Sequence, residues 1–65
     1  MVRVAIVGCG GIGSRHAQGA ARAPEVSHID CVDVDKNSID LCKTRLEEIN
    51  HNKQVVFHSN VASLT

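Results

Sequence analysis

The sequence has no excess of charge of either sign, because seven Lys and Arg residues face seven Asp and Glu residues among 65. A nucleic-acid or anionic-membrane binder usually carries a basic excess, so we expect neither partner. No apolar run approaches the roughly 20 residues that cross a bilayer. A basic segment followed by an apolar core and a small-residue cleavage site is also lacking, which argues against a secretory signal. We therefore expect a cytoplasmic protein.

The sequence has few residues that could cross-link a small chain. Its three cysteines, Cys9, Cys31 and Cys42, cannot all pair, and none belongs to a Cys-x-x-Cys motif. We expect them to be small hydrophobic side chains kept reduced in the cytosol, and we predict no metal site. A domain of about 60 residues buries only roughly 60% of its unfolded surface. We therefore expect the chain to be a part of a larger protein.

The composition, 43% hydrophobic and 22% charged residues, is typical of a folded chain. Along the sequence, segments with a strand pattern alternate with segments with a helix pattern. The β-branched run at residues 2–7 predicts a strand, and its near-continuous apolarity is typical of a strand buried on both faces. Further elements are expected in this order: a helix over 12–23, a strand over 27–34, a helix to about residue 50, a strand over 54–58 and a short helix over 60–64. Asp35 can cap the second of these helices, and Asn37 and Ser38 are alternative caps.

This alternation predicts an α/β fold with a parallel sheet and right-handed crossovers. Three strands make the first βαβαβ half of a Rossmann-like doubly wound parallel sheet. We expect residues 1–65 to be the N-terminal part of such a domain. The first strand would then be central, with its second neighbour supplied by residues after Thr65, and the rest of the domain and a substrate domain would lie outside this chain.

The motif that indicates function is Gly-x-Gly-x-x-Gly at Gly8, Gly10 and Gly13. It follows a predicted strand and opens a predicted helix, and Asp33 lies 20 positions beyond Gly13 at the end of the second strand. This context is that of a dinucleotide-binding fingerprint. Gly8 would allow the tight turn, where a Cβ would clash. Gly10 would let a pyrophosphate approach the backbone, and Gly13 would let the helix pack against the sheet.

The first turn of the predicted helix supplies the expected anion site. Its backbone N–H groups have no partners within the helix and lie at the positive end of the helix dipole. Gly11 and Ile12 belong to this turn, so we count them among the cofactor-binding residues together with the three motif glycines.

Asp33 would select the cofactor. A carboxylate at this strand end accepts hydrogen bonds from the adenosine ribose hydroxyls and repels a 2′-phosphate. No arginine follows it, and Lys36 is a weaker candidate for binding that phosphate. We therefore expect NAD as the cofactor and regard NADP as less favoured.

Neighbouring residues have less specific roles. We expect His16 to pack against the neighbouring strand rather than contact the phosphates, and Cys9 to fill space rather than act as a redox thiol. Arg15 would either reach a phosphate or stay solvated on the helix surface. Gly19, which costs about 1 kcal/mol in a helix, would either allow close packing on the sheet or have no role. The other histidines would be surface or strand-edge residues: His28, His51 and His58.

Two segments resemble the N-terminal Rossmann domain of the Gfo/Idh/MocA oxidoreductases: Val4-Ala5-Ile6-Val7-Gly8-Cys9-Gly10-Gly11-Ile12-Gly13-Ser14-Arg15-His16-Ala17 and Ala23-Pro24-Glu25-Val26. The resemblance implies NAD(P)-dependent hydride transfer at a secondary alcohol of a sugar, cyclitol or similar polyol. It also leads us to expect a homo-oligomer as the complete protein. The family's catalytic lysine, in a Glu-Lys-Pro motif, is not in this sequence. We therefore predict no catalytic residue here and no catalysis by this part alone.

Two other classes remain open. The run Gly8 to Ser14 and the Asp33-Val34-Asp35 segment also resemble the ubiquitin-activating-like ATP-dependent adenylyltransferases, although the Asn-Leu-x-Arg-Gln segment of that group is missing. A non-catalytic NAD-sensing module would keep the same glycine motif. A methyltransferase is disfavoured because Ile12 stands where that class has glycine.

Overall fold

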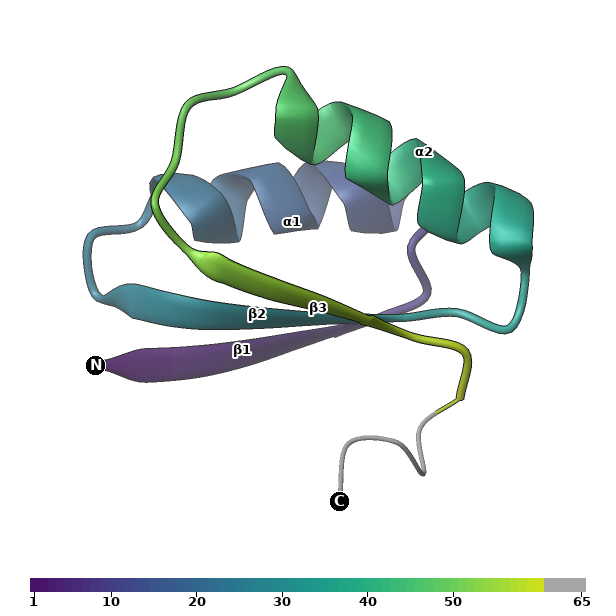
Figure 1. Cartoon of the computed structure of the whole chain (residues 1–65), viewed down its shortest axis with the longest axis horizontal. Coiled ribbons are helices and arrows are strands. Elements are labelled where there is room, and N and C mark those ends of the chain that lie inside the picture. The colour runs from purple at the N-terminus through teal and green to yellow at the C-terminus, as the bar shows by residue number, and fades with distance from the viewer. Residues whose placement is uncertain (61–65) are drawn as a thin grey trace.

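A computed structural model describes residues 1–60 of the chain. The elements are β1 (Val2–Val7), α1 (Gly11–Arg22), β2 (Val26–Val32), α2 (Lys36–Glu47) and β3 (Gln54–His58). The strands form one parallel sheet in the order β1-β2-β3 (Figure 1). This α/β arrangement corresponds to the first βαβαβ half of a Rossmann-like fold, as the sequence predicts.

Both helices lie on the same face of the sheet (Figure 1). The strands turn alternate residues toward them, so that Val4 of β1 lies opposite Ile29 of β2, which lies opposite Val55 of β3. The core between the sheet and the helices is made of small and medium side chains: Cys9, Ala17, Ala21, Val26, Ile29, Cys31, Cys42 and Leu46. Alanines on α1 let that helix lie close to the strands.

The element boundaries follow from local chemistry. Helix α1 ends at Arg22 because Ala23 has extended dihedral angles (φ −78°, ψ 124°), as residues before a proline prefer. Asp35 caps α2 as predicted, since its carboxylate accepts a hydrogen bond from the Asn37 amide. That helix ends at Glu47 and not near residue 50.

The second strand also ends earlier than predicted, at Val32 rather than at residue 34. The carboxylate of Asp33 accepts a hydrogen bond from the Asp35 amide at 2.8 Å, which turns the chain out of the sheet. The predicted short helix over 60–64 falls almost entirely on residues 61–65, which lie outside the described residues.

The sheet face opposite the helices is open in the described part of the chain. On β1 the residues of this face are exposed, and Val7 keeps 65% of its surface accessible. The prediction that this strand is buried on both faces is therefore wrong for residues 1–60. Both helices pack on the other face of the sheet, so no described element covers the open face of β1. β1 also forms an edge of the sheet in residues 1–60.

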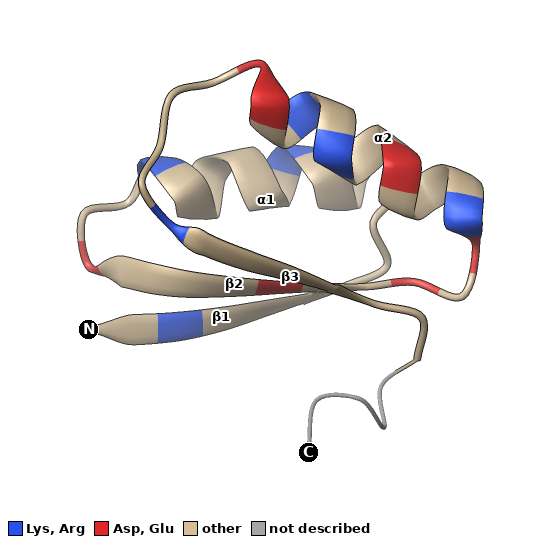
Figure 2. Cartoon of the chain, viewed as in Figure 1, with Lys and Arg blue, Asp and Glu red and all other residues tan. Residues whose placement is uncertain are grey.

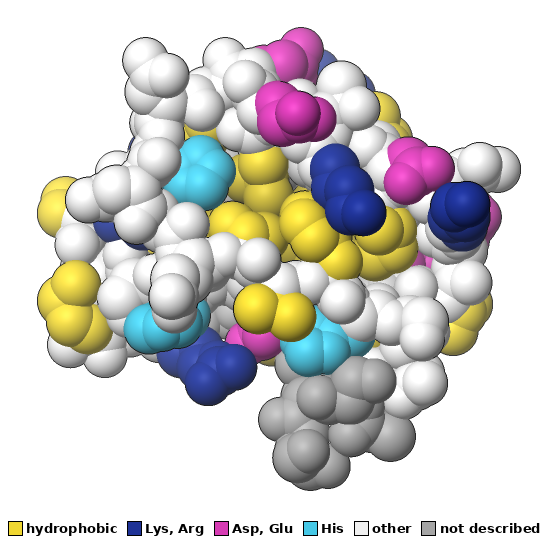
Figure 3. Space-filling view, viewed as in Figure 1, with side chains coloured by type: hydrophobic (Ala, Val, Ile, Leu, Met, Phe, Trp, Pro, Cys, Tyr) yellow, Lys and Arg dark blue, Asp and Glu magenta, His cyan; other side chains and the backbone are white. Residues whose placement is uncertain are grey.

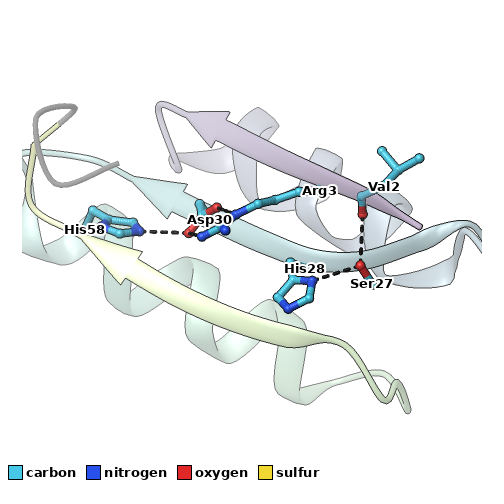
Figure 4. A network of polar contacts seen from close by, with 6 residues as sticks. All are labelled: Val2, Arg3, Ser27, His28, Asp30 and His58. Carbon is cyan, nitrogen blue, oxygen red and sulfur yellow. Dashed lines mark hydrogen bonds and ion pairs between the residues drawn. The ribbon is translucent and has the colours of Figure 1, made fainter. Parts of the chain in front are cut away.

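A buried carboxylate lies on this open face. Asp30 of β2 accepts hydrogen bonds from Arg3 Nε at 2.8 Å and from His58 Nε2 at 2.9 Å (Figure 4). The hydrogen bond from Arg3, followed by that from His58, lowers the pKa of Asp30 from 3.8 to about 2. The carboxylate therefore links all three strands, because its two partners lie on β1 and β3.

Basic and acidic positions are interspersed along α2 (Figure 2). Apolar side chains reach the surface between α2 and β3, in a depression of about 470 Å³ whose lining includes Leu46, Val55 and Phe57 (Figure 3). The ammonium group of Lys43 lies 5.1 Å from the centre of the Phe57 ring. The core is thus less completely covered at the β3 edge.

Candidate functional site

Gly8 forms the turn that leaves β1. Its φ of +91° lies in the left-handed region, which residues with a side chain rarely adopt. Its amide donates a hydrogen bond to the Val32 carbonyl at 2.8 Å, which fixes the turn against β2. No atom lies within 4 Å of the position of a Cβ. Glycine is therefore required here by the backbone conformation, and the predicted clash with neighbouring atoms is wrong.

Gly13 is required for packing. A Cβ at this position would lie 1.7 Å from the Gly8 carbonyl oxygen and 2.8 Å from the Gly8 carbonyl carbon. These are backbone atoms, which cannot move away as a flexible side chain can. The predicted role of Gly13, close packing of the helix on the strand end, is confirmed.

The protein itself does not require glycine at Gly10 and Gly11. A Cβ at Gly10 would have only the Ser38 hydroxyl within 4 Å, at 3.9 Å, and one at Gly11 would have no neighbour. Gly10 also has an ordinary φ of −63°. The space beside these two residues is open, so backbone amides can be reached from outside.

The N-terminus of α1 leaves backbone amides without side-chain partners. Gly10 occupies the N-cap position and offers no side-chain cap, and the first turn contains no acidic residue. The first backbone hydrogen bond of the helix runs from the Ser14 amide to the Gly10 carbonyl, at 2.8 Å. The amides before it have no partner inside the helix and lie at its positive end. Ile12, in this turn, is 77% exposed.

Asp33 is held against the glycine loop. Its Oδ2 accepts a hydrogen bond from the Cys9 amide at 2.8 Å, and its Oδ1 accepts one from the Asp35 amide at 2.8 Å. The bond from Asp35 and then that from Cys9 lower the pKa of Asp33, so the carboxylate is ionised at neutral pH. Each oxygen keeps a further lone pair for a ligand. The sequence predicted the place of Asp33 at the strand end but not its bond to the loop.

A cleft of about 350 Å³ lies beside the turn after β1 and the end of β2. Its lining is made of Val7, Gly8, Val32, Asp33, Val34 and Asn60. The structure thus brings the glycine loop and Asp33 together at the carboxyl ends of two neighbouring parallel strands. Open α/β sheets bind ligands at this edge.

The residues around the glycine loop differ in part from their predicted roles. His16 is exposed and lines a depression of about 410 Å³ together with Ala5, Ile6 and Val7 of β1, so it lies beside the neighbouring strand without being buried against it. Arg15 is exposed on α1. Gly19 is also exposed, and no atom lies within 4 Å of its Cβ position, so close packing does not explain it.

His58 is the histidine whose environment differs most from the prediction. Its side chain is only 11% exposed, because it lies against Asp30 on the sheet. The sequence predicts a surface or strand-edge residue, and His58 does lie on β3, at an edge of the described sheet. The sequence does not show that β3 places it beside a carboxylate of β2.

The sequence also missed a cluster of cysteines. Cys9, Cys31 and Cys42 are all free and fully buried, as expected of small apolar residues. Their sulfur atoms, however, lie within 4.8 Å of one another. Positions 9, 31 and 42 match no ligand spacing, so only the packing of a loop, a strand and a helix reveals the cluster.

Comparisons with known proteins identify no relative. No protein-family model, no curated protein and no solved structure matches the chain. Among the described residues, no helix has the length and apolarity that crossing a membrane requires. The functional interpretation therefore depends on the residues of the site.

Proposed function

We propose that this chain binds the adenosine diphosphate half of NAD, as the N-terminal part of the Rossmann domain of an oxidoreductase. The observation that supports this most is the contrast between Gly13 and Gly10. The fold itself requires Gly13, whereas Gly10 lies in open space with an ordinary backbone conformation. A ligand that approaches the backbone accounts for glycine at Gly10.

The pyrophosphate would bind at the first turn of α1. Free amides and the helix dipole favour a negative group there, and no acidic side chain of that turn opposes it. The chain is neutral overall, but this does not weaken the proposal, because backbone groups do the binding.

The adenosine ribose would bind at Asp33. The two amide hydrogen bonds orient its carboxylate beside the cleft and keep it ionised. An ionised carboxylate accepts hydrogen bonds from the ribose hydroxyls and repels a 2′-phosphate, which favours NAD over NADP. Lys36, exposed at the start of α2, is a single cation near this region.

The reaction we propose for the complete protein is hydride transfer between the nicotinamide and a secondary alcohol of a sugar, cyclitol or similar polyol. This follows from the resemblance to the Gfo/Idh/MocA oxidoreductases. The catalytic groups and the substrate domain would lie in other parts of the protein, which we expect to be a cytoplasmic homo-oligomer. The chain described here would supply cofactor binding alone.

Calorimetric titration of the protein with NAD, NADP and ATP tests this function. We expect NAD to bind more tightly than NADP, and the variant Gly10→Val to lose NAD binding because its side chain would occupy the pyrophosphate position. Gly19→Ala, an exposed change on the same helix, is the matched control and should bind NAD as the wild type does. Unchanged NAD affinity in Gly10→Val would contradict the proposed geometry, and binding of ATP without NAD would favour an adenylyltransferase.

A further inference from the structure

Three thiols from three different elements meet in the core. Cys9 lies in the loop between β1 and α1, Cys31 on β2 and Cys42 on α2. All three are fully buried. The sulfur atoms of Cys31 and Cys42 are 3.5 Å apart, and all three sulfur atoms lie within 4.8 Å of one another. Cys9 belongs to the glycine loop, and none of the three cysteines lines the cleft beside Asp33.

The spacing of the sulfur atoms matches that of a metal–thiolate site. A metal–sulfur bond of about 2.3 Å places thiolates around one ion about 3.8–4.0 Å apart, in tetrahedral or trigonal geometry. The Cys31–Cys42 separation of 3.5 Å and the upper limit of 4.8 Å for all three sulfur atoms lie on either side of this value.

We propose that Cys9, Cys31 and Cys42 together bind one soft, thiophilic metal ion of the class that includes Cu⁺, Zn²⁺ and Cd²⁺. Three sulfur ligands select soft ions over Mg²⁺ and Ca²⁺, which require oxygen ligands. A three-thiolate set also differs from a disulfide, which would use Cys31 and Cys42 and leave Cys9 out.

The ionisation of the thiols is compatible with metal binding. The hydrogen bond that Cys42 shares with Cys31, and then its interaction with Cys9, lowers the pKa of Cys42. Burial raises the pKa of Cys9 to about 11, and the hydrogen bond to Cys42 followed by burial raises that of Cys31. The ion therefore displaces protons from the thiols, and its affinity should rise with pH.

Binding of the metal ion by the three thiols requires no oxidant. Each ligand forms a metal–sulfur bond and releases one proton to solvent, and no electron is transferred. The amide of Cys9 also donates a hydrogen bond to Asp33. An ion bound to the Cys9 sulfur would therefore be linked through this one residue to the glycine loop and to Asp33.

Titration of the reduced chain with Cd²⁺ under anaerobic conditions tests the proposal, with the cadmium–thiolate ultraviolet absorption as the readout. We expect one ion per chain and no response to Mg²⁺. The single variants Cys9→Ser, Cys31→Ser and Cys42→Ser should each weaken binding by about 100-fold or more. Ser38→Ala, a change outside the cluster, should bind as the wild type does. Binding that persists when Cys9 is replaced would overturn the three-thiolate site.

A second measurement needs no substitution in the core. If the folded chain holds the ion, the thermal unfolding midpoint of the wild type should rise as Cd²⁺ is added, and Mg²⁺ should leave it unchanged. A fall of the midpoint would mean that Cd²⁺ binds thiols of the unfolded chain, and an unchanged midpoint would mean that no folded site exists. Either result would overturn the proposal, and neither depends on NAD binding.

Discussion

At the scale of single residues, the glycine motif combines three different physical requirements. Gly8 is fixed by a left-handed backbone conformation, and Gly13 by contact with the backbone of Gly8. Gly10 satisfies neither condition, and we propose that a bound ligand accounts for glycine there. We therefore expect Gly8 and Gly13 to affect the stability of the fold, and Gly10 to affect ligand binding.

Replacing Gly13 should damage the fold. In Gly13→Ala the new Cβ would overlap the Gly8 carbonyl, so β1 and α1 must move apart, and we expect a loss of about 3 kcal/mol in the free energy of unfolding. Gly11→Ala, for which the structure shows open space, is the control and should unfold at nearly the wild-type denaturant concentration. Equal stability of the two variants in urea denaturation would contradict the described packing.

Replacing Asp33 should change cofactor choice. In Asp33→Ala the carboxylate that accepts ribose hydroxyls is lost, so NAD affinity should fall by more than NADP affinity. The same change removes the acceptor of the Cys9 and Asp35 amides, and Asp33→Asn, which keeps an oxygen acceptor without the charge, separates the two effects. Titration with both cofactors measures the ratio, and an equal loss for both would remove the ribose role.

At the scale of elements, each helix is placed by its ends as much as by its buried face. Asp35 begins α2 and Ala23, before Pro24, ends α1. The interior of α1 is less well adapted, because Gly19 lies at its exposed surface without a contact that explains it.

Gly19→Ala should therefore stabilise the chain. Alanine costs about 1 kcal/mol less than glycine in a helix interior, and its Cβ would meet no atom within 4 Å. We expect a rise of about that size in the free energy of unfolding, measured by urea denaturation. A destabilised variant would show that α1 packs more closely at this point than the structure describes.

The strands are linked on their open face by Asp30, and this gives stability a defined dependence on pH. The folded pKa of about 2 lies below the ordinary 3.8, so the contribution of this carboxylate is present above about pH 4 and is lost as the pH falls toward 2. Wild type and Asp30→Asn should differ most in thermal midpoint above pH 4 and converge near pH 2. A constant difference across this range would mean that the ionised carboxylate does not stabilise the fold.

At the scale of the whole molecule, local patterns were sufficient to predict the order of elements and the α/β class. β-Branched runs, alanines and the Asp35 cap act over a few residues, so their effects are visible in the sequence. The place of Asp33 beside the glycine loop followed from the geometry of parallel strands.

Features that depend on packing between distant segments could not be predicted in the same way. The Asp30–His58 contact depends on the register of β2 and β3, and the cysteine cluster depends on how α2 lies over β2. The exposure of the outer face of β1 depends on both helices packing on one side of the sheet. Each is a property of the assembled fold and has no local pattern.

The most direct test of the central claim follows the backbone amides themselves. In ¹⁵N NMR spectra of the isotope-labelled protein, addition of NAD should shift the amide signals of Gly10, Gly11 and Ile12 at the start of α1. Signals of the last turn of the same helix, near Arg22, should stay in place. A folded protein whose first-turn amides do not respond to NAD at millimolar concentration would contradict the account.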